Sequence, residues 1–219
     1  GNISLDVKEA KIILTQQGEI VIPDYERAFS HQIIEAFMVL ANETVASYAF
    51  ALESPFIYRI HEKPSEEKAK SFRAFAQGLG LTARFNAEDV KPYDYQNLLK
   101  SAQDHPAYSV LNRVMLRSMQ KAKYSSVNIG HFGLSEKNYC HFTSPIRRYP
   151  DLQIHRIIKE QIRGKLTGER IRHYKEILEQ VCKQSSNMER RANEAERETE
   201  KLKKAEYMER FIGQSFDGV

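Results

Sequence analysis

Cysteine is scarce in this sequence, which contains only Cys140 and Cys182 among its 219 residues. The two lie far apart and share no Cys-x-x-Cys spacing. This excludes a disulfide framework and gives no paired metal ligands of that kind. We therefore expect both residues to be reduced, structural thiols.

Long apolar runs are also missing. No stretch approaches the roughly 18 uncharged apolar residues of a membrane helix, and Gly1 to Lys11 mix charged with apolar residues instead of forming a signal peptide. The sequence has no internal repeat and no low-complexity tract. With 41% hydrophobic residues, the chain is long enough to bury a core. We expect a globular, cytoplasmic protein with no membrane partner.

Charge is distributed unevenly along the chain. The formal net charge is +4, yet the window from Cys140 to Lys175 holds nine Lys or Arg against three acids, which is +6 and leaves −2 for the rest. A local basic stretch in a nearly neutral protein is typical of a site for a polyanion, although solvated helix faces also produce such runs.

The spacing of apolar residues predicts an α+β fold, mostly helical with a partial antiparallel sheet. The first strand of a hairpin begins almost at Gly1, which favours a chain that starts partway into a sheet. A Ser186/Glu189 capping box predicts that a separate last helix begins there. The expected elements are a hairpin within Ile3 to Pro23, helices from Ser30 to before Pro55, from Pro64 to Gly80, Tyr93 to Ala102, from Pro106, Pro150 to Gly164 and Glu169 to Lys183, the last helix after Ser186, and a strand Phe56 to Ile60.

Helical spacing is lost between Lys123 and Pro150, where aromatic, small and basic residues alternate. Function tends to reside in such segments. Arg147 and Arg148 follow Pro145 and stand close to the hydroxyls of Thr143 and Ser144, a combination that suits phosphate oxygens. The helix that opens at Pro150 adds free N–H groups. The alternative is that either arginine pairs with an internal carboxylate, such as Asp151 or Glu196.

The run His141-Phe142-Thr143-Ser144-Pro145-Ile146-Arg147-Arg148-Tyr149-Pro150-Asp151-Leu152, followed by His155-Arg156, resembles the signature of the ribonuclease R and ribonuclease II catalytic domain. The resemblance spans essentially the whole chain. It is supported in order by Glu35 to Asn42, Tyr58 to Glu62, Tyr124-Ser125 and Gly130 to Leu134. It implies that residues 1–211 are the carboxy-terminal half of that domain, and that 212–219 begin a following RNA-binding β-barrel.

The resemblance also implies roles for single residues. Arg147 would stabilise charge on the phosphate being cleaved, Glu196 would stand in the same site, and Glu35 would help to hold the terminal ribose. The alternatives are a solvated acid for Glu196 and a salt bridge or capped core polar group for Glu35. The remaining residues predicted to bind RNA are Arg148, Thr143, Ser144, Tyr149 and His141. For His141, as for His131, a structural role is favoured over metal ligation, since no third ligand stands at a telling spacing.

By the family's route, the intact protein would degrade single-stranded RNA processively from its 3′ end to nucleoside 5′-monophosphates, as a monomer with magnesium. The magnesium ligands would lie upstream, because the aspartates here are scattered, so we expect no metal ligand in this chain and no activity from it alone. Two alternatives stay open: a non-catalytic RNA-binding module on a decayed nuclease domain, and a partner-binding protein using the helix Asn187 to Arg210. The aspartates are Asp6, Asp24, Asp89, Asp94, Asp104, Asp151 and Asp217.

Overall fold

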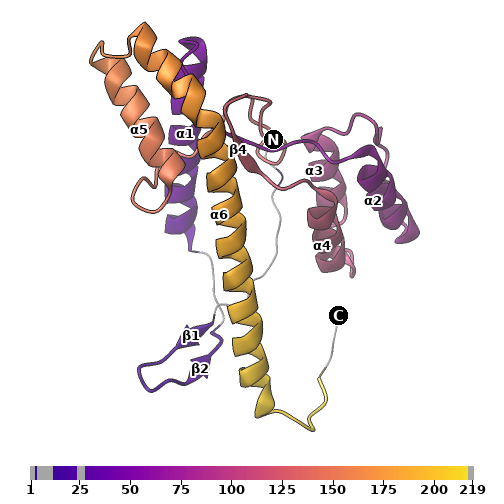
Figure 1. Cartoon of the computed structure of the whole chain (residues 1–219). Helices are drawn as coiled ribbons and strands as arrows, with labels where there is room; N and C mark the ends of the chain where they lie inside the picture. The colour runs from indigo at the N-terminus through magenta and orange to yellow at the C-terminus, as the bar shows by residue number, and fades with distance from the viewer. Residues whose placement is uncertain (1–2, 4–11, 24–27, 217–219) are drawn as a thin grey trace. The chain divides into compact units, whose positions relative to one another are not determined.

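The computed structural model describes residue 3, residues 12–23 and residues 28–216 (Figure 1). The chain divides into two compact units. Unit 1 comprises Gly1–Val7 and Glu35–Ser186, and unit 2 comprises Lys8–Ile34 and Asn187–Val219.

Unit 1 contains two groups of helices and a two-stranded sheet (Figure 1). The antiparallel strands β3 and β4 pair Arg59 with Tyr124. Two long helices, α1 and α6, contribute to both units. The elements are α1 (Phe29–Ala51), β3 (Tyr58–Ile60), α2 (Glu66–Gly78), α3 (Pro92–Ser101), α4 (Tyr108–Ser118), β4 (Lys123–Ser125), α5 (Tyr149–Ile162) and α6 (Gly168–Glu209).

The helices α2, α3 and α4 share one hydrophobic core around Tyr95. Its ring meets those of Phe72, Phe85 and Phe132 edge-on, at centroid distances of 5.0, 5.5 and 6.0 Å. Burial raises the pKa of the Tyr95 hydroxyl. Such aromatic pairs add about 0.5–1.5 kcal/mol each beyond the area they bury.

A second core joins α1, β3, α5 and the first part of α6. Ala46 of α1, Ile154 of α5 and Leu178 of α6 are all buried there. Cys140 and Cys182 lie in the same core as free thiols, as predicted. Burial raises the pKa of the Cys182 thiol to about 12, which keeps it protonated at neutral pH.

The predicted fold class is confirmed for the described residues, with two differences in the elements: strand β4 was not predicted, and one predicted helix is wrong. The separate last helix is wrong, because α6 continues without a break from Gly168 to Glu209. The Ser186 hydroxyl does not cap a helix start. It donates to the carbonyl of Cys182 at 2.8 Å, one turn back, and accepts the N–H of Tyr124 in β4 at 3.0 Å. Serine can satisfy its hydroxyl in this way inside a helix, so a capping-box pattern does not fix a helix start.

α1 departs from expectation in two ways. By length and composition it is apolar enough to cross a membrane, although no such stretch was expected. In addition, its apolar side chains are only partly buried: Ala46 and Ala49 are covered, whereas Phe37, Tyr48 and other large residues are exposed. The buried alanines and the buried, hydrogen-bonded Asn42 place the second half of α1 in the core of unit 1. Helical spacing predicts which residues lie on one face of a helix, but not how much of that face packs against other elements.

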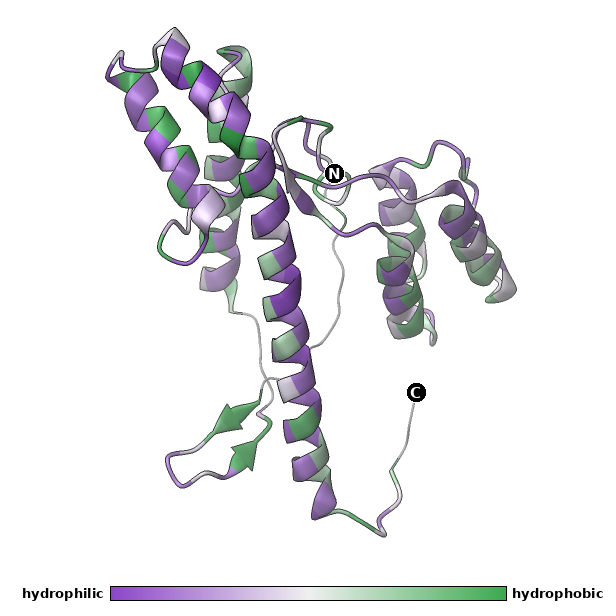
Figure 2. Cartoon of the chain, in the orientation of Figure 1, coloured by the Kyte–Doolittle hydropathy of each residue, from purple (hydrophilic) through white to green (hydrophobic). Residues whose placement is uncertain are grey.

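Unit 2 contains a hairpin and the second part of α6. Strands β1 (Ile13–Leu14) and β2 (Ile20–Val21) pair antiparallel, which confirms the hairpin over residues 12–23, while residues 4–11 of that prediction lie outside the described residues. The Arg210 guanidinium donates to the Ile20 carbonyl at 3.1 Å. Figure 2 shows the strands of the hairpin as hydrophobic and α6 as mostly hydrophilic. The predicted boundary at residue 212 stays a prediction, since 212–216 are irregular and 217–219 are not described.

Candidate functional site

The loop from His141 to Arg148 precedes α5 in unit 1 and is held by one buried carboxylate. The Asp151 side chain is 0% exposed, and its Oδ2 accepts the Ser144 N–H at 2.8 Å. The same oxygen accepts two bonds from the Arg148 guanidinium, at 2.7 and 3.1 Å. The Ser144 carbonyl in turn accepts the backbone N–H groups of Arg147 and Arg148, at 3.3 and 3.1 Å. Asp151 therefore joins the middle of the loop, at Ser144, to its end at Arg148.

This pairing is the alternative that the sequence left open for Arg148. Because its side chain is only 18% exposed and its guanidinium is bound by Asp151, Arg148 stabilises the loop. Asp151 lies in the first turn of α5, where its negative charge interacts with the positive end of the helix dipole. The helix dipole therefore contributes less to binding a phosphate at this loop. Binding of RNA by Arg148 stays a prediction that this geometry does not support.

Arg147 is placed in the opposite way. Its side chain is exposed, and it forms no ion pair with any residue that the structure describes. Its neighbour Ile146 is fully exposed, and Tyr149 is 51% exposed at the start of α5. The guanidinium group of Arg147 is permanently charged and planar, and it stands on a loop of fixed shape, so it can bind a phosphate through two hydrogen bonds. The exposed Ile146 was not singled out from the sequence, since an apolar residue beside a proline gives no signal of exposure.

Asn42 joins α1 to the segment 139–142, where the loop begins. Although it is only 4% exposed, all its polar groups are used. Its Oδ1 accepts the Phe142 N–H at 2.9 Å, its Nδ2 donates to the Tyr139 hydroxyl at 3.1 Å, and its carbonyl accepts the Cys140 thiol at 3.2 Å. Sequence reasoning missed this residue, whose one signal was a polar side chain on an otherwise apolar face.

Two histidines complete the support. His155 bonds through Nε2 to the Phe142 carbonyl at 2.9 Å, and its ring stacks on that of Phe142 at 4.1 Å. His141 bonds through Nδ1 to the Tyr124 hydroxyl at 2.9 Å, with the Arg59 guanidinium 4.7 Å from the centroid of the Tyr124 ring. Burial, and then the charge of Arg148, lower the pKa of His141 to about 2. His141 is therefore neutral at physiological pH.

His131 lies beside this region, and its ring is also engaged. Its Nδ1 accepts the Leu134 N–H at 3.1 Å, and its ring meets that of His61 edge-on at 5.0 Å. Burial, and then the neighbouring His61, lower the pKa of His131 to about 3. Both rings thus have the hydrogen bonds expected of structural histidines.

Acid should destabilise unit 1 through these two rings. The unfolded chain binds a proton at each histidine below about pH 6.5, whereas the folded pKa values are about 3 for His131 and about 2 for His141. Their contribution to stability is therefore complete above pH 6.5 and is lost as the pH falls from there toward the folded pKa values. We expect the urea concentration at the unfolding midpoint to be lower at about pH 5 than at about pH 7.5, because these two values lie on either side of the unfolded pKa of histidine.

A substitution isolates the effect of His131. His131→Asn keeps an acceptor for the Leu134 N–H but cannot be protonated, so it should flatten the dependence of the midpoint on pH. The exposed His173 supplies the matched control, His173→Asn. If both substitutions reduced the pH dependence of the unfolding midpoint equally, burial of His131 would not be the cause of that dependence.

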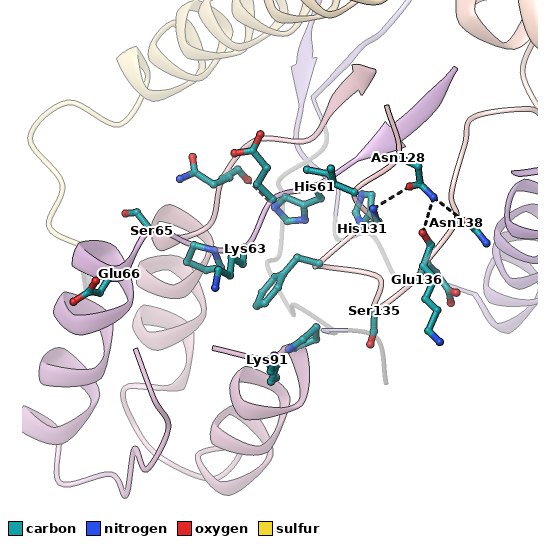
Figure 3. Close-up of a pocket in the computed structure, with 18 of the residues that line it drawn as sticks. His61, Lys63, Ser65, Glu66, Lys91, Asn128, His131, Ser135, Glu136 and Asn138 are labelled. Atoms are coloured by element: carbon teal, nitrogen blue, oxygen red, sulfur yellow. Dashed lines mark hydrogen bonds between the residues drawn. The ribbon is translucent and has the colours of Figure 1, made fainter. Parts of the chain in front are cut away.

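A cavity in unit 1, shown in Figure 3, has a volume of about 1250 Å³ and is lined in part by His61 and His131. His61 is fixed there, with Nε2 bonded to the Gln120 carbonyl at 2.8 Å and Nδ1 accepting the Gly133 N–H at 3.0 Å. Of the three lysines that line the cavity, Lys63 and Lys91 both pair with Asp89, at 3.5 and 2.8 Å, and only Lys137 forms no ion pair with a described residue. The lining also carries four glutamates, so the Arg147 loop and not this cavity is the candidate phosphate site. These are Glu62, Glu66, Glu88 and Glu136.

The remaining predicted residues are distributed over both units. Thr143 and Ser144 lie half-buried in the loop beside Arg147, so the structure brings these three together. Glu35 is exposed on α1 in unit 1. Glu196 is exposed on α6 in unit 2, so its place in one site with Arg147 stays a prediction.

No group of three or more His, Cys, Asp or Glu side chains within residues 12–23 and 28–216 is arranged to hold a metal ion. The described residues therefore do not fit a magnesium site, which prefers clustered carboxylate oxygens.

Comparison with known proteins gives a consistent result. Residues 1–164 match the RNB domain. The chain is 43% identical to "Ribonuclease R 1" of Lactococcus lactis over 220 residues, which cover 100% of this chain and 27% of that protein. It is 41% identical to Ribonuclease R of Thermotoga maritima, covering 99% of this chain and 31% of that protein. The chain thus spans about a third or less of these relatives.

Among solved structures, Mycoplasma genitalium RNase R in complex with ribose methylated single-stranded RNA matches with a TM-score of 0.92 and 30% identity, over 98% of this chain and 34% of that one. Its complex with double-stranded RNA gives a TM-score of 0.94 at 30% identity, over 100% and 39%. Yeast Ssd1, described as a pseudonuclease, shares the fold at a TM-score of 0.62 and 24% identity, over 74% of this chain and 20% of that one.

Proposed function

We propose, because the chain belongs to the RNB domain family, that the protein containing it is a processive 3′→5′ exoribonuclease. Its substrate is single-stranded RNA, which it hydrolyses to nucleoside 5′-monophosphates. The observation that carries the proposal is the asymmetry of the two adjacent arginines. Arg148 is tied to Asp151, while Arg147 is exposed and forms no ion pair with the described residues.

The chemistry of phosphodiester hydrolysis explains what Arg147 does. Negative charge builds on the phosphate oxygens as water attacks, and a fixed guanidinium stabilises that charge more than it stabilises the bound substrate. Because Asp151 and Asn42 already fix the loop, little reorganisation is needed when the phosphate arrives. Thr143 and Ser144 supply hydroxyl groups beside it, and Tyr149 offers a ring on which a base stacks.

Magnesium belongs to this proposal, but its ligands do not come from the described residues. They are assigned to aspartates upstream of Gly1, while Arg147 and Glu196 complete the catalytic site and Glu35 contacts the terminal ribose. Magnesium would polarise the phosphate and generate the attacking hydroxide. On this basis the isolated chain is inactive. The intact protein is proposed to be a cytoplasmic monomer that does not bind membranes.

The test uses RNA labelled at either end. The intact protein with magnesium should release labelled nucleoside monophosphate at once from 3′-labelled RNA, whereas 5′-labelled RNA should shorten stepwise. A chelator should abolish both. Internal cleavage, or release that begins at the 5′ end, would refute the exoribonuclease proposal.

The alternative is an RNA-binding module on a decayed nuclease domain, and the fold shared with the pseudonuclease Ssd1 gives it a specific basis. It predicts that the intact protein binds RNA without degrading it. The same assay, with a binding measurement beside it, separates the two.

A further inference from the structure

The exposed face of α5 carries three cations in one line. Arg156, Lys159 and Arg163 follow one another at steps of three and four residues, the spacing that places side chains on one helix face, and all three are exposed. The opposite face is buried, with Ile154 at 0% and Ile157 at 1% exposure. The three cations therefore point away from the core of unit 1. We call them the α5 cation stripe.

The stripe has no ion-pair partner in the part of the chain that the structure describes, although the pKa of Glu160 is lowered by the hydrogen bond from Arg170 and, in smaller part, by the charge of Arg156. None of its three side chains forms an ion pair with a described residue. The one acid of α5 near the stripe, Glu160, is engaged elsewhere, since Arg170 donates to its two oxygens at 3.0 and 2.8 Å and the Tyr174 hydroxyl donates at 2.8 Å. Like charges three and four residues apart destabilise a helix by about 0.2–0.5 kcal/mol per pair. An anionic partner would remove this repulsion.

The stripe continues from the candidate phosphate site. Between Arg147 and Arg156, the same face of α5 presents Tyr149 and Leu152, which are 51% and 43% exposed. In chain order the surface is therefore a cation, an aromatic and an apolar side chain, and three more cations. Charged groups that track a backbone, combined with an aromatic ring for a base, are the usual elements of single-strand binding.

We propose that the α5 cation stripe binds the phosphates of the RNA strand that leads toward Arg147. This inference rests on the proposed function and extends it to a second surface. From Arg156 to Arg163 the helix rises about 10 Å, at about 1.5 Å per residue, and Arg156 follows Tyr149 by about another 10 Å, so the stripe serves nucleotides on the 5′ side of the one held at Arg147. The regular spacing of single cations favours a repeating polyanion over an acidic protein surface.

Salt dependence of binding tests the inference directly. In the intact protein with a chelator present to stop cleavage, the affinity for a fluorescent single-stranded RNA long enough to cover α5 is measured at several salt concentrations. Each phosphate contact contributes about 0.7 to the slope of log K against log salt for single strands. The triple substitution Arg156→Gln, Lys159→Gln, Arg163→Gln should therefore make the slope shallower by about 2 and weaken binding. A trinucleotide bound at Arg147 should not reach the α5 cation stripe. The triple variant should therefore bind it with the same affinity as the wild type.

The matched control removes three exposed cations from the first part of α6, by Arg172→Gln, Lys175→Gln and Lys183→Gln. This control lowers the net charge by the same amount as the triple substitution in α5, and it should leave the slope of log K against log salt unchanged. A second variant, Arg156→Lys with Arg163→Lys, keeps the charge and should keep the slope, which excludes a folding defect as the cause.

The outcomes divide clearly. An unchanged slope in the triple variant, or an equal change in the control, overturns the inference. If the wild-type protein neither binds nor degrades RNA, the proposed function fails instead. If RNA affinity is equal in wild type and the triple variant while an acidic peptide binds only the wild type, the stripe serves a protein partner and the RNA assignment is wrong.

Discussion

Replacing Arg147 by alanine in the intact protein lowers kcat for RNA hydrolysis by about 100- to 1000-fold, the loss expected when one preorganised donor to a developing oxyanion is removed. The structure supports this size because the side chain is exposed and not paired with any described residue. KM should change much less, since the contact strengthens as charge builds on the phosphate. Steady-state rates on a 3′-labelled oligonucleotide measure both constants.

Arg147→Lys separates charge from geometry. It keeps the positive charge but loses the planar fork, so it should recover only part of the rate. Arg113→Ala, which removes an exposed arginine from α4, is the matched control and should leave kcat unchanged. Activity of Arg147→Ala above about a tenth of wild type would contradict a role in the transition state, since it corresponds to less than about 1.4 kcal/mol.

The second large effect concerns stability. Asp151→Asn should destabilise the fold by about 3–5 kcal/mol, because it leaves the Arg148 charge without its buried partner. It also weakens the bond from the Ser144 N–H that closes the loop. Unfolding in urea, followed by the fluorescence or circular dichroism of the intact protein, measures the change.

Two further variants define this effect. Glu62→Gln breaks the exposed pair with Lys123 and should cost about 0–1 kcal/mol, as surface ion pairs do. The double variant Asp151→Asn, Arg148→Met removes both charges and should be more stable than Asp151→Asn alone. If Asp151→Asn costs no more than Glu62→Gln, the carboxylate does not hold the loop.

The sequence predicted the elements well, since helix spacing, proline starts and glycine stops are local signals. It was wrong at Ser186, where a tertiary bond from Tyr124 decides the role of the hydroxyl. It predicted the loop around Arg147 but left the fate of Arg148 open, because which of two adjacent arginines faces a buried carboxylate depends on the path of the turn. Asn42 escaped notice because its partners are about 100 residues away in the chain, as the separations of 97, 98 and 100 residues show.

The most direct test compares Arg147→Ala with Arg148→Ala, two changes of equal charge and size at adjacent positions. The structure predicts that Arg147→Ala loses kcat while its unfolding midpoint stays at the wild-type value. Arg148→Ala should lower the unfolding midpoint, because it leaves the buried Asp151 unpaired, and its kcat, measured where it is folded, should fall less than that of Arg147→Ala. The reverse result, with Arg148 setting the rate and Arg147 the stability, would contradict the assignment of the two arginines.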